Sequence, residues 1–89
     1  MNIKYTTQFK KDYKKAKKQN KDIEKLKLII EKLLSDTILE EKYQDHNLTG
    51  KWKNYRECHI TPDWILIYKK DPHTLILVRT GSHSELFKK

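Results

Sequence analysis

The stretch NYRECHITPDWILIYKKDPHTLILVRT, residues 54–80, decides the fold of this chain. It contains three short runs, NYRECHI, WILIY and TLILV, and each has the length and the residue types of a β-strand. Pro62 and Asp63 separate the first two runs, and a second segment with an aspartate and a proline separates the last two, which is turn chemistry typical of hairpins. The stretch therefore predicts a three-stranded antiparallel meander that ends at Arg79 and Thr80.

The residues before this stretch predict one strand and two helices. Ile3 and Tyr5 alternate with polar residues, as in a short strand, and helical spacing of apolar residues begins after Thr7. Asp22 is suited to cap a second helix, which carries the wider apolar stripe of the two. The apolar positions are Phe9, Tyr13 and Ala16 in the first helix and Ile23, Leu26, Ile29, Ile30, Leu33 and Leu34 in the second.

This order predicts an α+β fold, β-α-α-β-β-β, with a mostly antiparallel sheet. The break between the helices is too short for anything but a helical hairpin, so we expect the hairpin to pack on one face of the sheet. The segment 36–53 is polar and is predicted to be a connector. The second face of the sheet is left for another purpose.

Length and composition limit the class of protein. A chain of 89 residues predicts a single domain, residues 1–89, because it buries too little surface to divide its core. The lone cysteine, Cys58, cannot form an internal disulfide, and no apolar stretch has the length of a signal peptide core or a membrane span. We therefore expect a cytoplasmic protein with no membrane partner.

The charge of the chain predicts a polyanionic partner. The formal net charge is +8, and clustered cations release counterions when they meet a phosphate backbone, so nucleic acid is the first candidate and an acidic protein the second. Seven lysines lie between Lys10 and Lys21 against one aspartate. Such a run is typical of a solvated helix face, and it also suits docking to structured RNA.

Three histidines, one aspartate and one arginine are candidates for catalysis. His59 ends one strand and His83 follows the last one, so a meander would bring both toward one edge of the sheet, and His46 lies in the preceding connector. Imidazoles beside a carboxylate and a guanidinium suit cleavage of RNA by its own 2′-hydroxyl, which needs a base, an acid and a cation at the phosphate. The candidates are His46, His59, Asp63, Arg79 and His83, and no metal or cofactor is required.

Other readings of these residues stay open. A zinc site would use Cys58 and the histidines, although adjacent Cys58 and His59 point to opposite faces of a strand and no CxxC or HExxH spacing is present. The histidines are also compatible with purely local hydrogen bonding, and Arg56 with an ordinary salt bridge. Among the aromatic residues, Trp64 and Phe87 are the better candidates for stacking on RNA bases.

Three segments resemble a known family. They are DHNLTGKWKNYRECH, residues 45–59; PDWILIY, residues 62–68; and RTGSHSELF, residues 79–87. In combination they resemble the YafQ-type toxins of the RelE superfamily, which belong to bacterial type II toxin–antitoxin systems, and the helical half, with its QFKKDYKKA opening, also fits. The resemblance implies a RelE-like fold and a ribosome-dependent endoribonuclease, an mRNA interferase, that cuts messenger RNA and stops translation.

The resemblance also implies partners and residue roles. An acidic antitoxin would hold the toxin inactive, and operator DNA would be bound only through their complex. His83 would be the general acid, with the base and transition-state roles divided among His46, His59, Asp63 and Arg79. Trp64 and Phe87 would contact substrate, and Lys51 and Lys53, which make the connector strongly basic, are added as substrate-binding candidates.

One alternative comes from a different class of function. A non-catalytic module that binds nucleic acid or an acidic antitoxin would use the same basic surface without cutting RNA. Such a module needs Arg79 and the lysines, but it has no use for an imidazole acid. The effect of replacing His83 therefore distinguishes the two functions.

Overall fold

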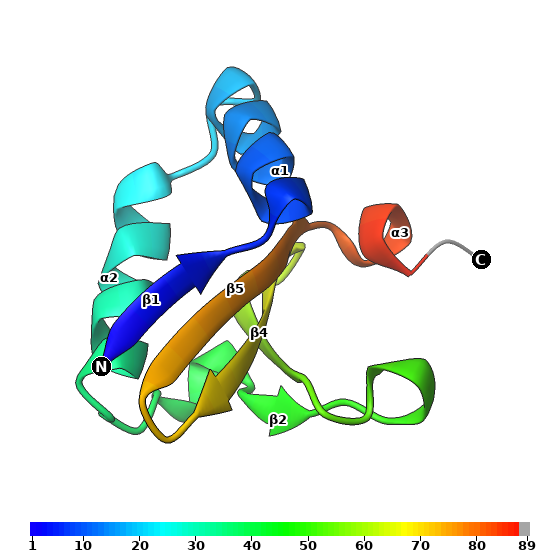
Figure 1. The fold of residues 1–89 in the computed structure, drawn as a ribbon. Coiled ribbons are helices and arrows are strands. Elements are labelled where there is room, and N and C mark those ends of the chain that lie inside the picture. The colour runs from blue at the N-terminus through cyan, green and yellow to red at the C-terminus, as the bar shows by residue number, and fades with distance from the viewer. Residues whose placement is uncertain (88–89) are drawn as a thin grey trace.

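The segment 54–80 forms the centre of a five-stranded mixed sheet in a computed structural model that describes residues 1–87 (Figure 1). The strands are β1 (Asn2–Tyr5), β2 (His46–Asn47), β3 (Arg56–Thr61), β4 (Trp64–Asp71) and β5 (Thr74–Gly81), in the order β1-β5-β4-β3-β2. β3, β4 and β5 form the predicted antiparallel meander, and β1 adds to β5 as a parallel strand. The α+β fold with a mostly antiparallel sheet is confirmed.

The central strand is covered on both faces. Ile65, Leu66 and Ile67 in β4 are each 0% exposed, and successive residues of a strand point to opposite faces. A strand that is buried on both sides reads as a continuous apolar run, which is why WILIY does not alternate.

The two predicted helices begin where side chains cap them. Thr6 accepts a hydrogen bond from the Phe9 backbone N–H at the start of α1 (Thr7–Lys18), and Asp22 accepts one from Lys25 at the start of α2 (Ile23–Leu34). These side chains satisfy backbone donors that have no partner inside the helix. No helix within residues 1–87 combines the length and the apolar character that crossing a membrane requires.

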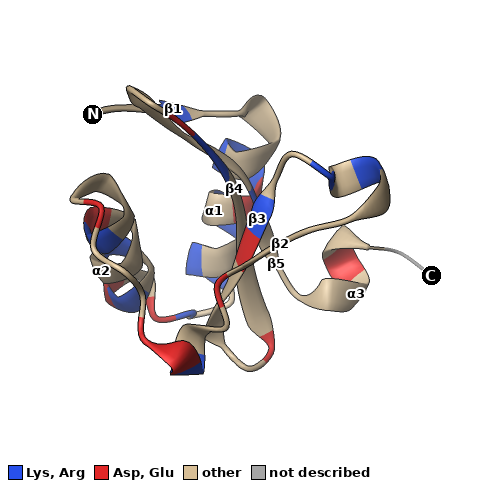
Figure 2. Ribbon diagram, turned by 90° about the horizontal axis from the view of Figure 1, so that it is seen from below, with Lys and Arg blue, Asp and Glu red and all other residues tan. Residues whose placement is uncertain are grey.

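Each face of the sheet has its own apolar cluster. The larger cluster joins α1 and α2 to the sheet through residues such as Leu26, Ile29, Leu66 and Leu77. A smaller one on the opposite face contains Ile65, Ile67 and Leu86, with Trp52, Tyr55 and Phe87 packed against it. Figure 2 shows α1 and α2 on one side of the sheet and α3 (His83–Leu86) on the other. We call this second side the site face.

The connector 36–53 contains more structure than the sequence predicted. It includes two short 3₁₀ helices, η1 (Glu41–Tyr43) and η2 (Gly50–Trp52), and the edge strand β2, which pairs antiparallel with β3. A strand of two residues has no periodicity of its own, because its partner determines it. This pairing places His46 directly opposite Glu57.

Candidate active site

Three histidines surround one buried carboxylate on the site face. His46 Nε2 lies 3.0 Å from Glu57 Oε2, His59 Nε2 lies 3.8 Å from the same oxygen, and His83 Nε2 lies 2.8 Å from Glu57 Oε1. The ring centroids of His46 and His59 are 6.5 Å apart, and those of His59 and His83 are 5.1 Å apart. We call these four residues the histidine–glutamate cluster. The three imidazoles therefore form a continuous row beside a single negative charge.

Sheet register explains why these residues meet. Glu57 and His59 are two apart on β3, so they project from the same face, and β2 brings His46 opposite Glu57. His59 pairs with Ile65, and Ile65 pairs with Gly81, where β5 ends. The chain then turns into α3, whose first residue is His83. The meander thus brings together histidines that are far apart in the sequence.

A capping box holds α3 in place. Ser82 Oγ accepts a hydrogen bond from the Glu85 backbone N–H, and the Ser82 backbone N–H donates to Glu85 Oε1. The second oxygen of Glu85 pairs with Lys15 of α1 at 2.5 Å. The hydrogen bond from Lys15, followed by the one from Ser82, lowers the pKa of Glu85 to about 2. His83 therefore begins a short helix that is fastened at both its cap and its side.

Phe87 completes this side of the cluster. Its ring stacks on His83 at a centroid distance of 5.8 Å and meets Trp52 edge-on at the same distance. An aromatic ring that packs against one face of an imidazole restricts its orientation. Phe87, predicted to contact substrate, therefore lies beside His83, and part of its surface is used for packing.

A second polar network orients His46 from the opposite side of the sheet. Arg56 pairs with Asp45, its Nη2 lying 3.3 Å from Asp45 Oδ2, and the hydroxyl of Tyr68 donates to Asp45 at 2.5 Å. His46 Nδ1 lies 2.5 Å from the carbonyl oxygen of Gln44. With Asp45 held by β3 and β4, the next residue is directed toward Glu57. The reading of Arg56 as an ordinary salt bridge agrees with this geometry.

Glu57 is the most unusual member of the cluster. Its side chain is 5% exposed, and among the described residues its Oε1 has no hydrogen bond of acceptable geometry, although His83 Nε2 lies close to it. Burial of a carboxylate costs free energy unless cations or donors compensate. Within residues 1–87, the groups that approach this carboxylate are the imidazoles of His46, His59 and His83, and a protonated imidazole would supply that compensation.

Arg79 lies on the same face but is held by another partner. Glu57 pairs with Ile67 and Ile67 pairs with Arg79, so the register places Arg79 in the same row, two strands from Glu57. Its guanidinium is bound by Asp12 of α1, with Nε 3.0 Å from Oδ2 and Nη2 3.1 Å from Oδ1. In the described part of the chain it has no ion pair with Glu57. The sheet therefore presents Arg79 beside the cluster, not inside it.

Three other predicted residues lie outside the cluster. Asp63 is exposed in the turn between β3 and β4, and none of the ion pairs within residues 1–87 joins it to a histidine. Lys51 and Lys53 are exposed in and next to η2. They remain candidates for contact with an extended RNA, because they project from the segment that carries Trp52 beside Phe87.

Trp64, predicted to contact substrate, does not lie on the site face. Trp64 is 1% exposed and belongs to the large apolar cluster under α1 and α2. Asp63 and Trp64 are adjacent, but the strand begins between them and turns the indole to the helix-covered face. A small domain fills its core with its largest side chains, and this favours burial of the ring.

The ligand set suggested for a zinc site does not come together, because Cys58 lies apart from the histidines, but a different set does. Cys58 is 0% exposed on the helix-covered side, and burial raises the pKa of its thiol, so it does not face the histidines. Glu57, His59 and His83 each offer one ligand atom, and these atoms all lie within 4.8 Å of one another. A carboxylate and two imidazoles suit a borderline cation such as Zn²⁺ or Cu²⁺. The same three residues therefore suit proton transfer and metal binding.

Sequence reasoning missed Glu57 and Asp12. Glu57 had a usable signal, because an acidic residue two positions before a candidate histidine on a strand shares its face. Asp12 had a weaker one: it is the single acid in the lysine-rich α1, and it is nearly buried. His83, which contacts Glu57, and Arg79, which contacts Asp12, both lie far from these acids in the sequence.

Comparison with known proteins identifies relatives over almost the whole chain. Residues 1–88 match a family model described as "Bacterial toxin of type II toxin-antitoxin system, YafQ". The "mRNA interferase toxin YafQ" of Escherichia coli (strain K12) is 48% identical over 86 residues, covering 96% of this chain and 94% of that protein.

Two solved structures show the same fold. The crystal structure of the E. coli DinJ–YafQ complex contains a chain with a TM-score of 0.90 and 46% identity, over 97% of both chains. The crystal structure of a metal-bound toxin from Helicobacter pylori matches with a TM-score of 0.91 and 42% identity, over 98% of this chain and 99% of that chain.

Proposed function

The chain belongs to the YafQ family of toxins of bacterial type II toxin–antitoxin systems, and from that membership we propose that it is an mRNA interferase. It is a ribosome-dependent endoribonuclease that cuts messenger RNA and inhibits translation. The 2′-oxygen of one nucleotide attacks the adjacent phosphorus, the bond from phosphorus to the 5′-oxygen breaks, and the products carry a 2′,3′-cyclic phosphate and a 5′-hydroxyl. One base and one acid are needed, because a proton leaves the 2′-hydroxyl and another reaches the 5′-oxygen.

The observation that carries this proposal is the single buried carboxylate beside three imidazoles. In the proposed reaction, the negative charge of Glu57 balances one imidazolium among the histidines that approach it. The reaction begins with one protonated imidazole, the acid, and one neutral imidazole, the base, and it ends with the two exchanged. The total charge of the cluster stays constant during cleavage, so the buried carboxylate is balanced at every stage.

Exposure distinguishes the roles of the three histidines. The side chains of His46 and His83 are about half exposed, at 49% and 46%, whereas His59 is 16% exposed and lies between them. We assign the acid to His83 and the base to His46, because both are open to substrate and each contacts Glu57. His59 separates the two rings, and Arg79 supplies a permanent positive charge for the phosphate.

Binding and regulation follow from the charge of the chain. With a net charge of +8, the lysines dock the protein on ribosomal RNA, and Lys51, Lys53 and Phe87 contact the messenger. A relative is crystallised with the protein DinJ, which supports a cognate antitoxin for this chain. An acidic antitoxin complements the lysine-rich surface, and it alone brings the toxin to operator DNA.

The reaction needs no metal, because the cluster itself supplies the acid, the base and the counter-charge. A divalent ion bound by Glu57, His59 and His83 would occupy the nitrogen that His83 uses to donate its proton. We therefore expect a chelator such as EDTA, tested at a Mg²⁺ concentration that keeps ribosomes intact, to leave the rate unchanged and added Cu²⁺ to inhibit. A chelator-sensitive rate that added metal restores would contradict this part of the proposal.

The decisive test compares the cleavage rates of two variants, His83→Ala and His73→Ala. His83→Ala removes the acid and is expected to slow cleavage of messages on programmed ribosomes by about 10² to 10⁴-fold, while ribosome binding is retained. His73→Ala is the matched control, because His73 is exposed in the β4–β5 turn. Cleavage by His83→Ala at the wild-type rate would refute the catalytic function and favour a non-catalytic binding module.

A further inference from the structure

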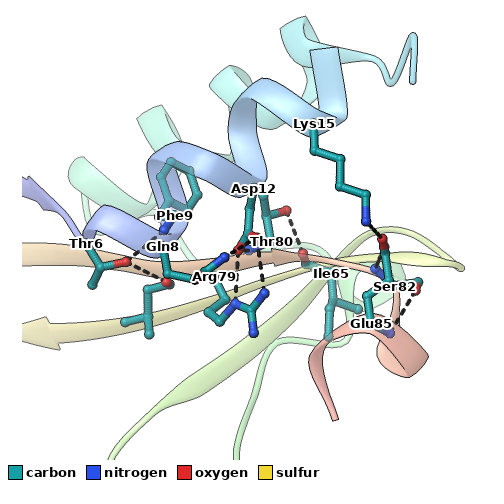
Figure 3. Close-up of polar contacts among 11 residues, drawn as sticks. Thr6, Gln8, Phe9, Asp12, Lys15, Ile65, Arg79, Thr80, Ser82 and Glu85 are labelled. Atoms are coloured by element: carbon teal, nitrogen blue, oxygen red, sulfur yellow. Dashed lines mark hydrogen bonds and ion pairs between the residues drawn. The ribbon is translucent and has the colours of Figure 1, made fainter. Parts of the chain in front are cut away.

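Helix α1 contains one acidic residue, and that residue is bound to the arginine beside the active site. Asp12 stands among six lysines in α1, yet its side chain is 8% exposed and points toward the sheet (Figure 3). Both carboxylate oxygens are in use. Oδ2 accepts from Arg79 Nε and from the Thr80 backbone N–H, and Oδ1 accepts from Arg79 Nη2 and from Gln8 Nε2.

This contact occurs where the sheet has an unpaired edge. β1 ends at Tyr5, so after Leu77 β5 is paired only with β4, and its other edge has no strand beside it. The cap residue of α1 and a residue within α1 bind this edge of β5 in place of a strand. Thr6 Oγ1 donates to the Val78 carbonyl, and Asp12 accepts from the Thr80 N–H. Arg79 lies between these two bonds, and its backbone is therefore fixed on both sides. Figure 3 shows Asp12 directly above the guanidinium.

Asp12 binds one edge of the Arg79 guanidinium and leaves the other edge without a partner among residues 1–87. Nε and Nη2 face Asp12, and the remaining donors are both hydrogens of Nη1 and one of Nη2, for which no partner exists within residues 1–87. A phosphate accepts from the free edge without displacing the aspartate. A long flexible side chain thus becomes a rigid donor with a defined direction.

We propose that Asp12 is a positioning residue, which holds the guanidinium of Arg79 in the direction that the scissile phosphate requires. The proposal rests on the proposed function, because it assumes that Arg79 stabilises the transition state. Asp12 touches no substrate, and its effect on the reaction passes through Arg79. A competing role is purely structural, since the same carboxylate closes the edge of β5.

The test is a double-mutant cycle of Asp12→Asn and Arg79→Ala, measured in single-turnover cleavage on programmed ribosomes. Asparagine keeps one acceptor for the Thr80 N–H but cannot accept from both guanidinium nitrogens. We expect Asp12→Asn to lower the rate at saturating toxin by about 10 to 100-fold. The half-saturating concentration should stay the same or fall, because a negative charge near the RNA is removed. In the Arg79→Ala background the same change should alter the rate less than about twofold.

The measured rates distinguish a role of Asp12 in positioning Arg79 from a role in folding. An equal loss in both backgrounds, a wild-type rate for Asp12→Asn or a wild-type rate for Arg79→Ala would overturn the proposal. Asp22→Asn, which makes the same chemical change at the cap of α2, is the control expected to keep the wild-type rate. A wild-type protein that cleaves no message would refute the proposed function, whereas a cleaving wild type with an unaffected Asp12→Asn would refute this inference alone.

A second measurement needs no variant. In the full chain the Nε–H of Arg79 donates to a nearly buried carboxylate, so its exchange with solvent, followed by NMR, should be at least about tenfold slower than that of a free arginine. Exchange at the free rate would show that the guanidinium is not held, and it would overturn the proposal even if Asp12→Asn failed to fold.

Discussion

Nε2 of His83, the first residue of α3, lies 2.8 Å from Oε1 of Glu57, which is buried on β3. This contact joins a short C-terminal helix to the centre of the sheet. Because His46 and His59 approach the other oxygen of the same carboxylate, Glu57 connects the three imidazoles electrostatically. The geometry makes Glu57 as informative a target as any of the histidines.

Glu57→Gln should separate stability from activity. The amide keeps the shape of the side chain but carries no charge to balance an imidazolium, so we expect cleavage to slow by about tenfold or more. Removal of a buried carboxylate also removes its desolvation cost, and the thermal midpoint should stay the same or rise. Glu24→Gln, at an exposed position of α2, is the control. A slower enzyme with a much lower thermal midpoint would instead indicate a structural role.

Trp64 should be required for folding and not for cleavage. Trp64→Ala leaves a cavity in the large apolar cluster and should lower the free energy of unfolding by about 3–5 kcal/mol, measured by urea denaturation. Trp64→Phe should cost less, because the indole Nε1 has no hydrogen-bond partner within residues 1–87. The phenylalanine variant should cleave at a rate near that of the wild type. A folded but inactive Trp64→Phe would restore the prediction of a substrate contact.

Gly81→Ala should move α3 out of position. An added Cβ would lie 3.2 Å from Glu85 Oε1 and 3.2 Å from Leu86 Cδ2, which is tighter than most Cβ contacts, and the φ of +157° at Gly81 adds backbone strain. Relief of this overlap shifts the helix that begins with His83, so the rate should fall by about tenfold or more, with a stability loss of about 1–3 kcal/mol. Gly50→Ala is the control variant, because an added Cβ there meets no atom within 4 Å. Its φ of +65° makes alanine lower the stability of the protein, but α3 keeps its position. Equal rates for the two variants would contradict this account.

The pair between Lys15 and Glu85 should make stability depend on acid pH. Glu85 has a pKa of about 2 in the folded chain against an ordinary value of 4.5, so the unfolded chain binds more protons between these values. The contribution of the pair is complete above pH 4.5 and is lost as the pH falls toward 2. Because both side chains are partly exposed, we expect it to stay below about 1 kcal/mol.

The measurement compares Lys15→Ala with the wild type in urea denaturation at several pH values. The difference in the free energy of unfolding should be present at neutral pH and should disappear near pH 2. Lys18→Ala, at an exposed position of the same helix, is the control for the loss of one positive charge. A difference that stays constant over this range would exclude Glu85 as the partner that titrates.

Local chemistry predicted most of the fold. The turns at Pro62 and Asp63, the cap at Asp22 and the apolar run from Trp64 to Tyr68 act over a few residues, so their consequences can be read in order along the chain. The strand β2 could not be predicted, because it exists only through its pairing with β3. The burial of Trp64 depended on the exact start of β4, a boundary that sequence patterns locate only within a few residues.

The sequence by itself determined the strand and helix order, the excess of lysine, and the three histidines and one arginine available for chemistry. Only the tertiary structure decided which of these side chains share a charge. Sheet register brings His46 and His59 beside Glu57, and the chain after β5 brings His83 to the same carboxylate. Arg79 is instead bound by Asp12 of α1. Electrostatic contacts act over a few ångströms in space, and residues this distant in sequence come within that range only when the sheet has formed.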